Sequence, residues 1–468
     1  DAFQEVDIIG VTRNIAKFVI MVRDREMLAQ RIKEAFYIAR SGKPGPVLVD
    51  LPTDVMAELG STSYPTEVNI RGYKPNKGVH VGQLKKAITL LEEAKKPMFL
   101  IGGGVNLAHA QQEMTKLAEK IDAPVITTVM GRGAISTEHP LYIGNIGMHG
   151  SYAANKTADE CDLMFSIGCR FNDRVTGEIK KFAPNAKIVH IDIESAAISR
   201  NVTVDIPIVA DAKAAILKIL EHTEPMEHKE WLDEIQGWDK EYPLQMEVKD
   251  GVNPQRIIET LNEVYADRDT VFTSDVGQHQ MWASQYLKLD ATHRLVQSGG
   301  LGTMGFGLPS AVGAQIGCPE KSIVSISGDG GFQMNMQELA TAVCQELPLV
   351  NIVFNNNRLG MVRQMQELFF KKRYTITCLR YHKSCKGKCG TPGWVCPEYV
   401  PDFVKMAEAY GTKGYFVTED EQLRDTILEA RDYAEKNKKP VIVECMVAPD
   451  ELVMPMIKGG ASFEDIML

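Results

Sequence analysis

The 468-residue chain lacks an apolar run of membrane-spanning length and lacks an excess of positive charge. A spanning helix needs about 20 consecutive, mostly apolar residues. The net charge of −9 gives no broad attraction to nucleic acid or to anionic lipid. No signal peptide, short repeat or low-complexity run is visible. We therefore expect that the chain binds neither nucleic acid nor a membrane.

Cysteine is also sparse, with nine residues that are scattered or clustered late in the sequence. In a chain of this length, such cysteines predict reduced thiols and a cytoplasmic location. The first residue is Asp1 rather than Met, so we expect that the natural start lies further upstream.

Hydrophobic residues, by contrast, are plentiful at 44%, enough for a large core and two or three domains. Apolar runs such as "PMFLIGGG", "LMFSIG", "SIVSISGDG" and "LVNIVFNNN" alternate with helical patterns. Because these runs are rich in β-branched residues and do not alternate with polar ones, they predict parallel strands covered on both faces. The predicted fold class is α/β, with several doubly wound parallel-sheet domains.

Composition also divides the chain. Residues 1–58 contain a helical pattern, "MLAQRIKEAFYIARSG", and a strand, "PVLVDLP". Polar residues with Pro and Gly predict a linker at 59–80, followed by a second domain at 81–222. A charged stretch at 223–250 is interpreted as another linker, and residues 251–468 as the last domain.

Two polar motifs follow neighbouring strands in the last domain. "SIVSIS" is a buried strand, "GDGG" a turn and "FQMNMQELATAVCQ" an amphipathic helix that leads to the strand "LVNIVF" and then to "NNN". In a right-handed β-α-β unit both strands point the same way, so Asp329 and Asn356 are expected at one sheet edge. Gly328, Gly330 and Gly331 would let backbone amides approach a ligand there.

A carboxylate and an amide oxygen are hard ligands that suit Mg²⁺, which phosphate and water oxygens would complete. The pattern therefore favours a metal-bound diphosphate. The alternative is that "GDG" is an ordinary turn and "NNN" an ordinary loop.

The GDG motif followed by a paired Asn resembles the thiamine diphosphate (ThDP) motif. "DVGQHQMWASQYL", "SGGLGTMGFGLPSAVGA" and "NNNRLGMVRQMQELFF" are similar to the catalytic large subunits of acetolactate synthase, as are "DAFQEVDIIGVTRNIAKF" and "SGKPGPVLVDLPTDV" upstream. The resemblance implies ThDP- and Mg²⁺-dependent decarboxylation of pyruvate and condensation with a second 2-ketoacid, pyruvate or 2-ketobutyrate. This is a transferase reaction of valine, leucine and isoleucine biosynthesis.

The resemblance also implies site residues. Asp329, Asn356 and the backbone oxygen of Arg358 would bind Mg²⁺. Met334, Met361, Met365 and Gln4 would serve the reaction, Met334 by holding ThDP bent, although core packing is the alternative for a methionine. The expected ThDP contacts, among which Gln278 and His279 would meet the diphosphate region, are Val276, Gly277, Gln278, His279, Gly302, Met304, Gly328, Gly330, Gly331 and Gly360.

The middle segment resembles the FAD-binding stretch of the biosynthetic members, through "IGMHGSYAANKTADECDLMFSIGCRFNDRVTG". In this family the flavin does not carry electrons for the reaction. For Arg170 and Arg174, which would contact the flavin phosphates, the alternative role is a surface ion pair with Asp173. The implied FAD contacts are Lys43, Gly147, Met148, His149, Gly150, Arg170, Asp173, Arg174, Asp192, Ile193 and Asp211.

Several positions depart from the family pattern. Lys43 stands where the family has Arg, which predicts a weaker flavin contact, and Thr53 stands where Lys is usual. Met365 stands where many members have Trp, so we expect weaker preference for 2-ketobutyrate over pyruvate. The insertion at 378–396 carries Cys378, Cys385, Cys389 and Cys396, which predict either a Zn or iron–sulfur site or free or paired thiols.

The resemblance implies a truncated pyrimidine-binding domain at 1–58, a FAD-binding domain at 81–222 and a diphosphate-binding domain at 251–468. The glutamate that activates ThDP in the family is expected upstream of Asp1. A homodimer or homotetramer with a small regulatory subunit is expected. The alternatives are another ThDP enzyme, of glyoxylate carboligase or pyruvate oxidase type, or a non-catalytic FAD- and ThDP-binding subunit.

Overall fold

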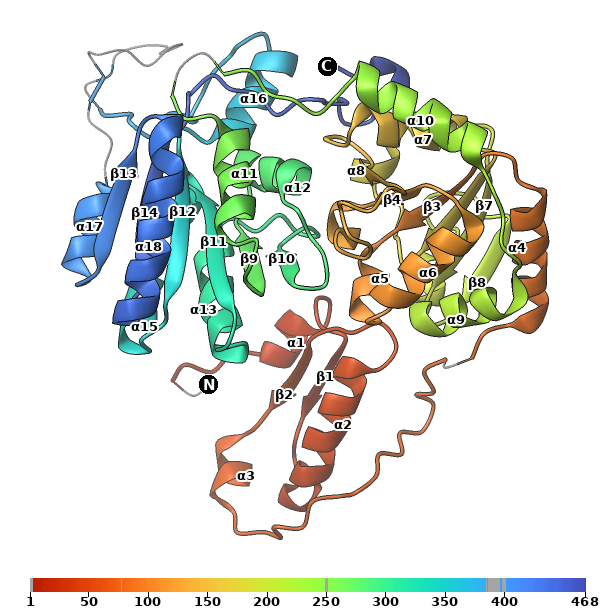
Figure 1. Ribbon diagram of the computed structural model, residues 1–468. Helices are drawn as coiled ribbons and strands as arrows, with labels where there is room; N and C mark the ends of the chain where they lie inside the picture. The colour runs from red at the N-terminus through yellow and green to blue at the C-terminus, as the bar shows by residue number, and fades with distance from the viewer. Residues whose placement is uncertain (1–2, 77, 249–250, 384, 386–395, 398–400) are drawn as a thin grey trace.

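The chain forms three α/β units (Figure 1) in a computed structural model that describes residues 3–76, 78–248, 251–383, 385, 396–397 and 401–468. The N-terminal unit lies below the other two in this view, and the two larger units lie side by side. The predicted α/β class with parallel sheets is confirmed, because each strand pair within a sheet is parallel.

The N-terminal unit is a small two-stranded sheet covered by one long helix. Strand β1 (Phe18–Met21) pairs with β2 (Val47–Asp50), and α2 (Leu28–Arg40) connects them. Lys17 donates from Nζ to the carbonyl oxygen of Ile38 at 2.6 Å and so fastens the sheet to the helix. The remaining elements here are α1 (Ile8–Thr12), η1 (Arg25–Met27) and α3 (Thr53–Ala57).

The middle unit is a six-stranded sheet in the order β5-β4-β3-β6-β7-β8. Numbered within the unit this order is 3-2-1-4-5-6, so the topology reverses between β3 and β6 and opens a crevice at their carboxyl ends. The strands are β3 (Pro97–Ile101), β4 (Val125–Thr127), β5 (Tyr142–Asn145), β6 (Leu163–Ile167), β7 (Lys187–Asp192) and β8 (Ile206–Val209).

Helices cover both faces of the middle sheet. One face packs on α4 (Val81–Glu93), α5 (Gly103–Leu107), α6 (Gln111–Ile121) and α9 (Ala212–His222). The other face packs on α7 (Tyr152–Glu160) and α10 (Lys229–Glu241). Short elements complete this unit: η2 (Val129–Gly131), α8 (Asp173–Thr176), η3 (Ile179–Lys181) and η4 (Ser195–Ala197).

The C-terminal unit is a second six-stranded sheet, in the order β10-β9-β11-β12-β14-β13. Here the order reverses between β9 and β11, which places the crevice at the ends of those two strands. The strands are β9 (Thr270–Ser274), β10 (His293–Gln297), β11 (Ser322–Gly328), β12 (Leu349–Asn355), β13 (Lys413–Val417) and β14 (Val441–Met446).

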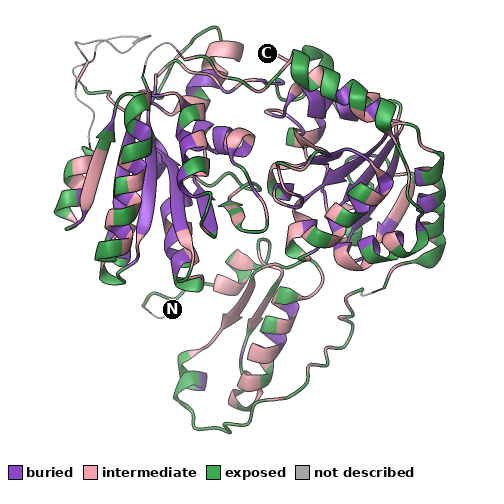
Figure 2. Ribbon diagram, in the orientation of Figure 1, coloured by how far each residue is buried: buried purple, intermediate pink, exposed green. Residues whose placement is uncertain are grey.

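Two helical layers enclose this sheet as well, and its central strands are buried along their length (Figure 2). One layer holds α11 (Pro254–Val264), α12 (Gln278–Tyr286) and α18 (Leu423–Asn437). The other holds α13 (Gly307–Gly317), α15 (Glu338–Cys344) and α17 (Phe403–Ala409). The other elements are α14 (Asp329–Phe332), α16 (Gly360–Phe369), η5 (Asp420–Gln422) and η6 (Phe463–Asp465).

The helix expected over "FQMNMQELATAVCQ" is interrupted. Its residues divide between the end of α14 and α15, and residues 333–337 form turns. Asn335 causes part of this break, because its Nδ2 donates to the carbonyl oxygen of Gly305 at 2.7 Å. The backbone bonds of this segment also span three residues rather than four, as from Met334 to Gly331. Periodicity alone could not reveal this tertiary contact.

The stretch 223–250, predicted as a linker, contains helix α10, which packs on the middle sheet. Trp231 is 3% exposed and donates from Nε1 to the carbonyl oxygen of Pro97 at 3.1 Å. Ile235 is fully buried beside it. The middle unit therefore extends beyond the predicted boundary at residue 222.

The end of the chain returns to the middle unit, where Figure 1 shows the C-terminus beside α10. The backbone N–H of Ile457 donates to the carbonyl oxygen of Met148 at 2.8 Å. Lys181 forms an ion pair with Glu464 at 2.9 Å across 283 residues of sequence. This tail joins the two large units.

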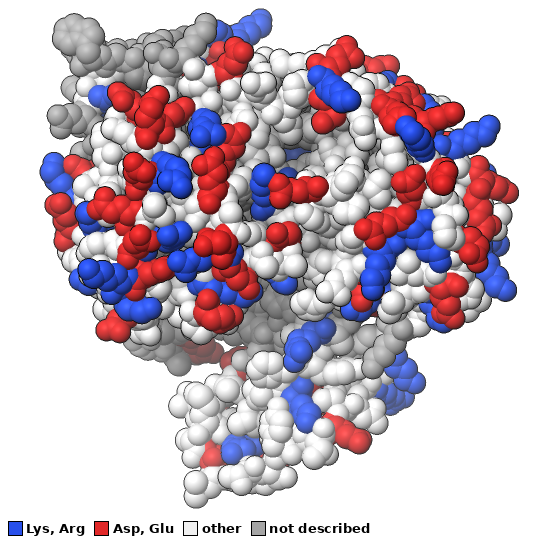
Figure 3. All heavy atoms as spheres, viewed as in Figure 1, with Lys and Arg blue, Asp and Glu red and all other residues white. Residues whose placement is uncertain are grey.

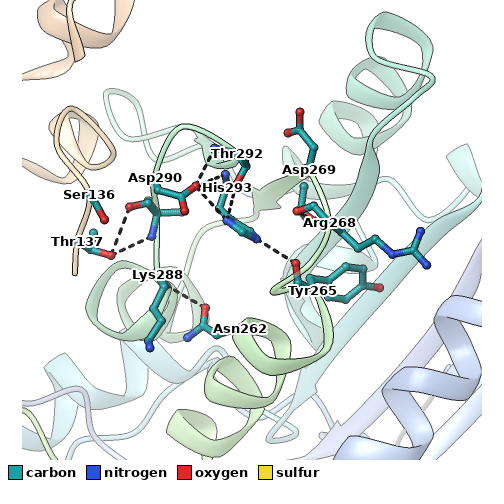
Figure 4. A network of polar contacts seen from close by, with 12 residues as sticks. Ser136, Thr137, Asn262, Tyr265, Arg268, Asp269, Lys288, Asp290, Thr292 and His293 are labelled. Carbon is teal, nitrogen blue, oxygen red and sulfur yellow. Dashed lines mark hydrogen bonds and ion pairs between the residues drawn. The ribbon is translucent and has the colours of Figure 1, made fainter. Parts of the chain in front are cut away.

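A polar network also joins the two units (Figure 4). Thr137 of the middle unit donates its backbone N–H to the carbonyl oxygen of Leu289 at 2.9 Å, and its hydroxyl accepts the N–H of Leu289 at 2.9 Å. Asp290 then accepts from His293, whose Nε2 lies 3.0 Å from the carbonyl oxygen of Tyr265. The paired bonds between Thr137 and Leu289 thus hold the two units together at this point.

The face shown in Figure 3 carries acidic and basic side chains interspersed. Of the described helices, none combines the length and apolarity that crossing a bilayer requires.

Candidate functional site at the carboxyl edge of the C-terminal sheet

The reversal between β9 and β11 brings two aspartates to one edge of the sheet. Asp275 follows β9 and Asp329 follows β11. Asp275 is 1% exposed, and its carboxylate accepts the N–H groups of Val276 at 2.8 Å, Gly305 at 3.1 Å and Gly307 at 2.8 Å. This aspartate therefore holds the loop before α13 against the strand ends.

Asp329 lies beside the loop that follows β12, as the β-α-β argument predicts. The carboxylate accepts the N–H of Gly330 at 2.8 Å, and the N–H groups of Asn357 and Arg358 lower its pKa. Burial outweighs them and raises the pKa of Asp329 to about 8. The carboxylate is thus held in a place where water does not stabilise its charge.

Asn356 completes the pair. Its Oδ1 accepts the N–H of Arg358 at 3.1 Å, and its Nδ2 donates to Oε1 of Gln278 at 3.2 Å. The amide oxygen is therefore held beside the backbone N–H of Arg358, which also acts on the Asp329 carboxylate. A carboxylate and an amide oxygen lie on adjacent loops, which is the donor set that Mg²⁺ prefers.

Glycines make this close approach possible. A Cβ on Gly331 would lie 2.2 Å from Oδ1 of Asp275, and one on Gly328 would lie 2.9 Å from Nδ1 of His279. On Gly360 it would lie 2.1 Å from Oε1 of Gln278. Contacts this short are not tolerated, so any larger residue would displace the polar groups around the cleft.

Three buried groups at the site have polar atoms without a hydrogen-bond partner in the described part of the chain. They are Oδ2 of Asp329, Nε2 of His279, and Nε and Nη2 of Arg358. Because burying a charge without a partner is costly, these atoms fit a ligand that supplies a cation to the carboxylate and an anion to the guanidinium. A metal-bound diphosphate has both properties.

Most of the predicted ThDP and metal residues line one cleft. They are Val276, Gly277, Gln278, His279, Met304, Gly328, Asp329, Gly330, Gly331, Asn356, Arg358, Gly360 and Met361. The lining also contains residues that the sequence reasoning missed, namely Trp282, Phe354, Leu359, Val362 and Val447. Asp275 was missed too, although an acidic residue directly after a strand at a topological switch point is a usable signal.

Four predicted residues do not line the cleft. Gly302 has a φ of 63° in the neighbouring loop. Met334 is 52% exposed in the turn that interrupts the predicted helix. Met365 lies on α16 beyond the cleft, and Gln4 lies exposed in the N-terminal segment. Their assigned roles stay predictions.

The predicted flavin residues gather at the corresponding edge of the middle sheet. Gly147 to Gly150 follow β5, Arg170 follows β6, Asp192 ends β7, and Asp211 follows β8. Gly102 and Gly168 cross here at the topological reversal, where a Cβ on Gly102 would lie 2.1 Å from the carbonyl oxygen of Gly168. Glycine is required at this crossing.

Buried polar groups at this edge also fit a ligand. Nδ1 of His149 and Nδ1 of His190 have no partner among the described residues. Burial lowers the pKa of His149 to about 4. Burial raises the pKa of Asp192, and the ammonium of Lys43 from the N-terminal unit opposes that effect. Lys43 is therefore close enough to act at this edge.

Other predicted flavin residues have structural partners. Arg174 pairs with Asp173 at 3.1 Å, and both side chains are mostly exposed, as the alternative interpretation has it. Asp211 caps α9 by accepting the N–H of Ala214 at 3.0 Å. A second cleft is lined by Gly147, Met148, Asp173 and Arg174 and by tail residues Ile457 to Gly459 and Ala461 to Phe463.

The cysteine-rich insertion is described only in part. Cys378, Cys385 and Cys396 are half-buried, and Cys389 lies outside the described residues. Within the described ranges, no three His, Cys, Asp or Glu residues form a group that could hold a metal ion. The Zn or iron–sulfur hypothesis stays a prediction.

Known families match both large units. The family described as "Thiamine pyrophosphate enzyme, central domain" matches residues 84–219, and "Thiamine pyrophosphate enzyme, C-terminal TPP binding domain" matches residues 275–445. The chain is 40% identical to the acetolactate synthase large subunit of Corynebacterium glutamicum, over all of this chain and 73% of the relative. It is 39% identical to the acetolactate synthase isozyme 3 large subunit of Escherichia coli, over 99% of this chain and 79% of the relative. A probable acetolactate synthase large subunit of Methanocaldococcus jannaschii is 40% identical, with 100% and 77% covered.

Proposed function

Because the chain belongs to the acetolactate synthase large subunits, we propose that it is the catalytic subunit of an acetolactate synthase. The reaction joins two 2-ketoacids after pyruvate loses CO₂, in the biosynthesis of branched-chain amino acids. The observation that carries the proposal is the cleft at β9 and β11, which Asp329, Asn356 and Arg358 line and where buried polar atoms of Asp329 and Arg358 have no hydrogen-bond partner among the described residues.

Bound ThDP would supply the electron sink that lets a 2-ketoacid lose CO₂. Asp329 and Asn356, with the backbone oxygen of Arg358, would hold Mg²⁺ against its diphosphate. The Arg358 guanidinium and His279 would donate to phosphate oxygens, which relieves the cost of burying them. The apolar side of the cleft, including Trp282, Phe354 and Met361, would exclude water from the reacting atoms.

FAD would bind at the carboxyl edge of the middle sheet. Support comes from the strand order, the Gly102–Gly168 crossing and the buried Nδ1 atoms of His149 and His190, which have no partner among the described residues. Pyruvate and 2-ketobutyrate are the proposed substrates, and a small regulatory subunit and a second copy of this chain are the proposed partners. A cytoplasmic location belongs to the same proposal.

The function is tested by expressing the chain from its whole reading frame, so that the glutamate expected to activate ThDP is present, and by measuring acetolactate from pyruvate with ThDP, Mg²⁺ and FAD supplied. Calorimetry of ThDP binding is run in parallel, with Asp329→Ala as the control. Acetolactate from the wild-type chain, and none from the variant, is expected. A different product, such as acetate or a glyoxylate condensation product, would overturn the proposal in favour of another ThDP enzyme. Tight ThDP binding without any product would favour the non-catalytic subunit.

The presence of Met at position 365 predicts the ratio of acetolactate to acetohydroxybutyrate. With a thioether in place of the larger indole, the pocket for the second ketoacid gains little binding energy from the extra methylene of 2-ketobutyrate. A pocket that buries this methylene gains about 1 kcal/mol of binding energy. Equal concentrations of pyruvate and 2-ketobutyrate should give comparable amounts of the two products, and Met365→Trp should shift the ratio about fivefold toward acetohydroxybutyrate. Strong 2-ketobutyrate preference in the unaltered chain would contradict the prediction.

A further inference from the structure

Two buried side-chain amides, those of Gln364 and Gln278, connect the tail of the chain to the candidate metal ligand Asn356. Gln364 of α16 is fully buried, and its side chain forms two hydrogen bonds with the backbone of Val453. Its Oε1 accepts the Val453 N–H at 2.9 Å, and its Nε2 donates to the Val453 carbonyl oxygen at 3.0 Å. Because a backbone N–H can only donate and a carbonyl can only accept, this pair of bonds fixes which end of the amide is oxygen.

The orientation is passed to Gln278. Nε2 of Gln278 donates to Oε1 of Gln364 at 3.0 Å and to the carbonyl oxygen of Glu451 at 2.7 Å. Both of its N–H groups are thus used, which leaves no donor on this side chain for a diphosphate. Oε1 of Gln278 must therefore point the other way, where it accepts from Nδ2 of Asn356 at 3.2 Å.

Asn356 is oriented from both sides. Gln278 requires its Nδ2, and the backbone N–H of Arg358 requires its Oδ1, at 3.1 Å. Gly360 leaves the space for the first contact, since a Cβ there would lie 2.6 Å from Nδ2 of Asn356. The polarity set at Val453 thus agrees with the polarity required at Arg358.

We propose that Gln364 and Gln278 are positioning residues that hold the amide oxygen of Asn356 toward the cation. We call these two side chains the relay, and the backbone of residues 451–453 anchors it. The inference rests on the proposed function, because it assumes that Asn356 binds Mg²⁺. Without the relay, only the Arg358 N–H fixes the orientation of Asn356, and the side chain more often presents its N–H₂ group to the cation, which repels it. Residues that orient a metal ligand typically contribute about 10- to 100-fold to metal affinity.

The test measures Mg²⁺ affinity from the Mg²⁺ dependence of ThDP binding by calorimetry, without turnover. Gln364→Met keeps the volume and removes both polar ends, and we expect about tenfold weaker Mg²⁺ affinity. Asn351→Leu is the matched control, because Asn351 is also fully buried and also donates to a backbone carbonyl, at 3.0 Å, but lies outside the relay. The control should bind Mg²⁺ within about twofold of wild type, well short of the loss expected for an orienting residue.

Gln364→Glu provides a signature that a purely structural role would not give. When protonated, its carboxyl can still donate to Val453 and accept from Gln278, whereas the carboxylate cannot donate. The Mg²⁺ affinity of this variant relative to wild type should therefore fall as pH rises, and should recover at low pH. Measuring the ratio removes the pH dependence of Asp329 itself.

These outcomes distinguish a failure of the proposed function from a failure of the relay hypothesis. If wild type binds no ThDP in a Mg²⁺-dependent way, the proposed function fails. If wild type binds ThDP in a Mg²⁺-dependent way but Gln364→Met has the same Mg²⁺ affinity, the relay is wrong. It is also wrong if the Mg²⁺ affinity of Gln364→Glu relative to wild type does not change with pH. If Asn351→Leu loses as much affinity as Gln364→Met, the loss reflects general destabilisation, and the relay is again overturned.

Discussion

The two six-stranded sheets share one architecture but differ in the residues at the carboxyl ends of their central strands. In the C-terminal sheet, β11 and β12 lead into Asp329 and Asn356, and buried polar atoms of Asp329 and Arg358 have no partner in the part of the chain that the structure describes. In the middle sheet, β3 and β6 lead into glycines that touch, and the polar groups lie further out, on β7 and after β5. The first edge suits a cation and a short anionic group, and the second suits an extended ligand that runs along several strand ends.

The difference shows that the fold supplies a place and the strand-end residues supply the chemistry. Both crevices arise where the strand order reverses, which needs no particular side chain. Chemical identity then depends on a few residues at each edge. Changing one edge should leave the other intact, and this expectation can be tested by substitutions at either edge.

The largest effect is expected from Asp329→Asn. Loss of the carboxylate should weaken Mg²⁺-dependent ThDP binding by at least about 100-fold, more than the loss of an orienting residue. FAD binding, measured by flavin fluorescence, should be unchanged because the middle sheet keeps its residues. A parallel loss of FAD affinity would contradict the independence of the two edges.

The same variant should stabilise the ligand-free protein at high pH. The folded carboxyl has a pKa of about 8 and the unfolded one about 3.8, so the folded state holds an extra proton between these values. Wild-type stability therefore falls as pH rises from about 4 to about 8, and Asn removes that loss. Denaturant unfolding at about pH 5 and about pH 9 should show the variant gaining on wild type at the higher pH.

A somewhat smaller effect is expected from Gly102→Ala at the middle edge. The new Cβ would collide with the Gly168 backbone oxygen at 2.1 Å, which cannot move without separating β3 from β6. We expect a loss of roughly 1–3 kcal/mol in the free energy of unfolding and loss of FAD binding, with ThDP binding retained. Gly237→Ala is the control, since no atom of the described residues outside the helix's own backbone lies within 4 Å of its Cβ on α10. That variant should gain about 0.5–1 kcal/mol from helix propensity.

The smallest effect is a pH dependence that the two edges share. Burial lowers the pKa of His149 in the middle unit and of His279 in the C-terminal unit to about 4, from 6.5. Between these values the unfolded chain binds protons that the folded chain cannot, so stability should fall as pH drops from about 6.5 to about 4. His279→Asn and His149→Asn should each reduce the slope of unfolding free energy against pH, and a slope unaffected by both would refute this explanation.

The sequence predicts the parts of this arrangement that follow from local pattern and chirality. Unalternating apolar runs identify the strands, and the handedness of β-α-β units brings Asp329 and Asn356 to one edge. It does not predict contacts between distant side chains. Asn335 reaches Gly305 and interrupts a helix that periodicity favours, and Trp231 gives an apparent linker a place in the middle core.

The amide relay illustrates the same limit at the site. Gln278 is predicted from its motif as a diphosphate contact, yet its donors go to Gln364 and Glu451. Which buried amide meets which depends on how α12, α16 and residues 451–453 pack, and no short motif encodes that packing.

The return of the tail to the middle unit has a consequence for biosynthesis. Lys181 and Glu464 are separated by 283 residues, so at roughly 5–20 residues per second the ribosome adds the second on the order of tens of seconds after the first. During that interval the cleft around Gly147 and Arg174 lacks the wall that Ile457 to Phe463 provide. The middle unit can fold its sheet early, but this cleft acquires its final shape only when synthesis reaches the tail.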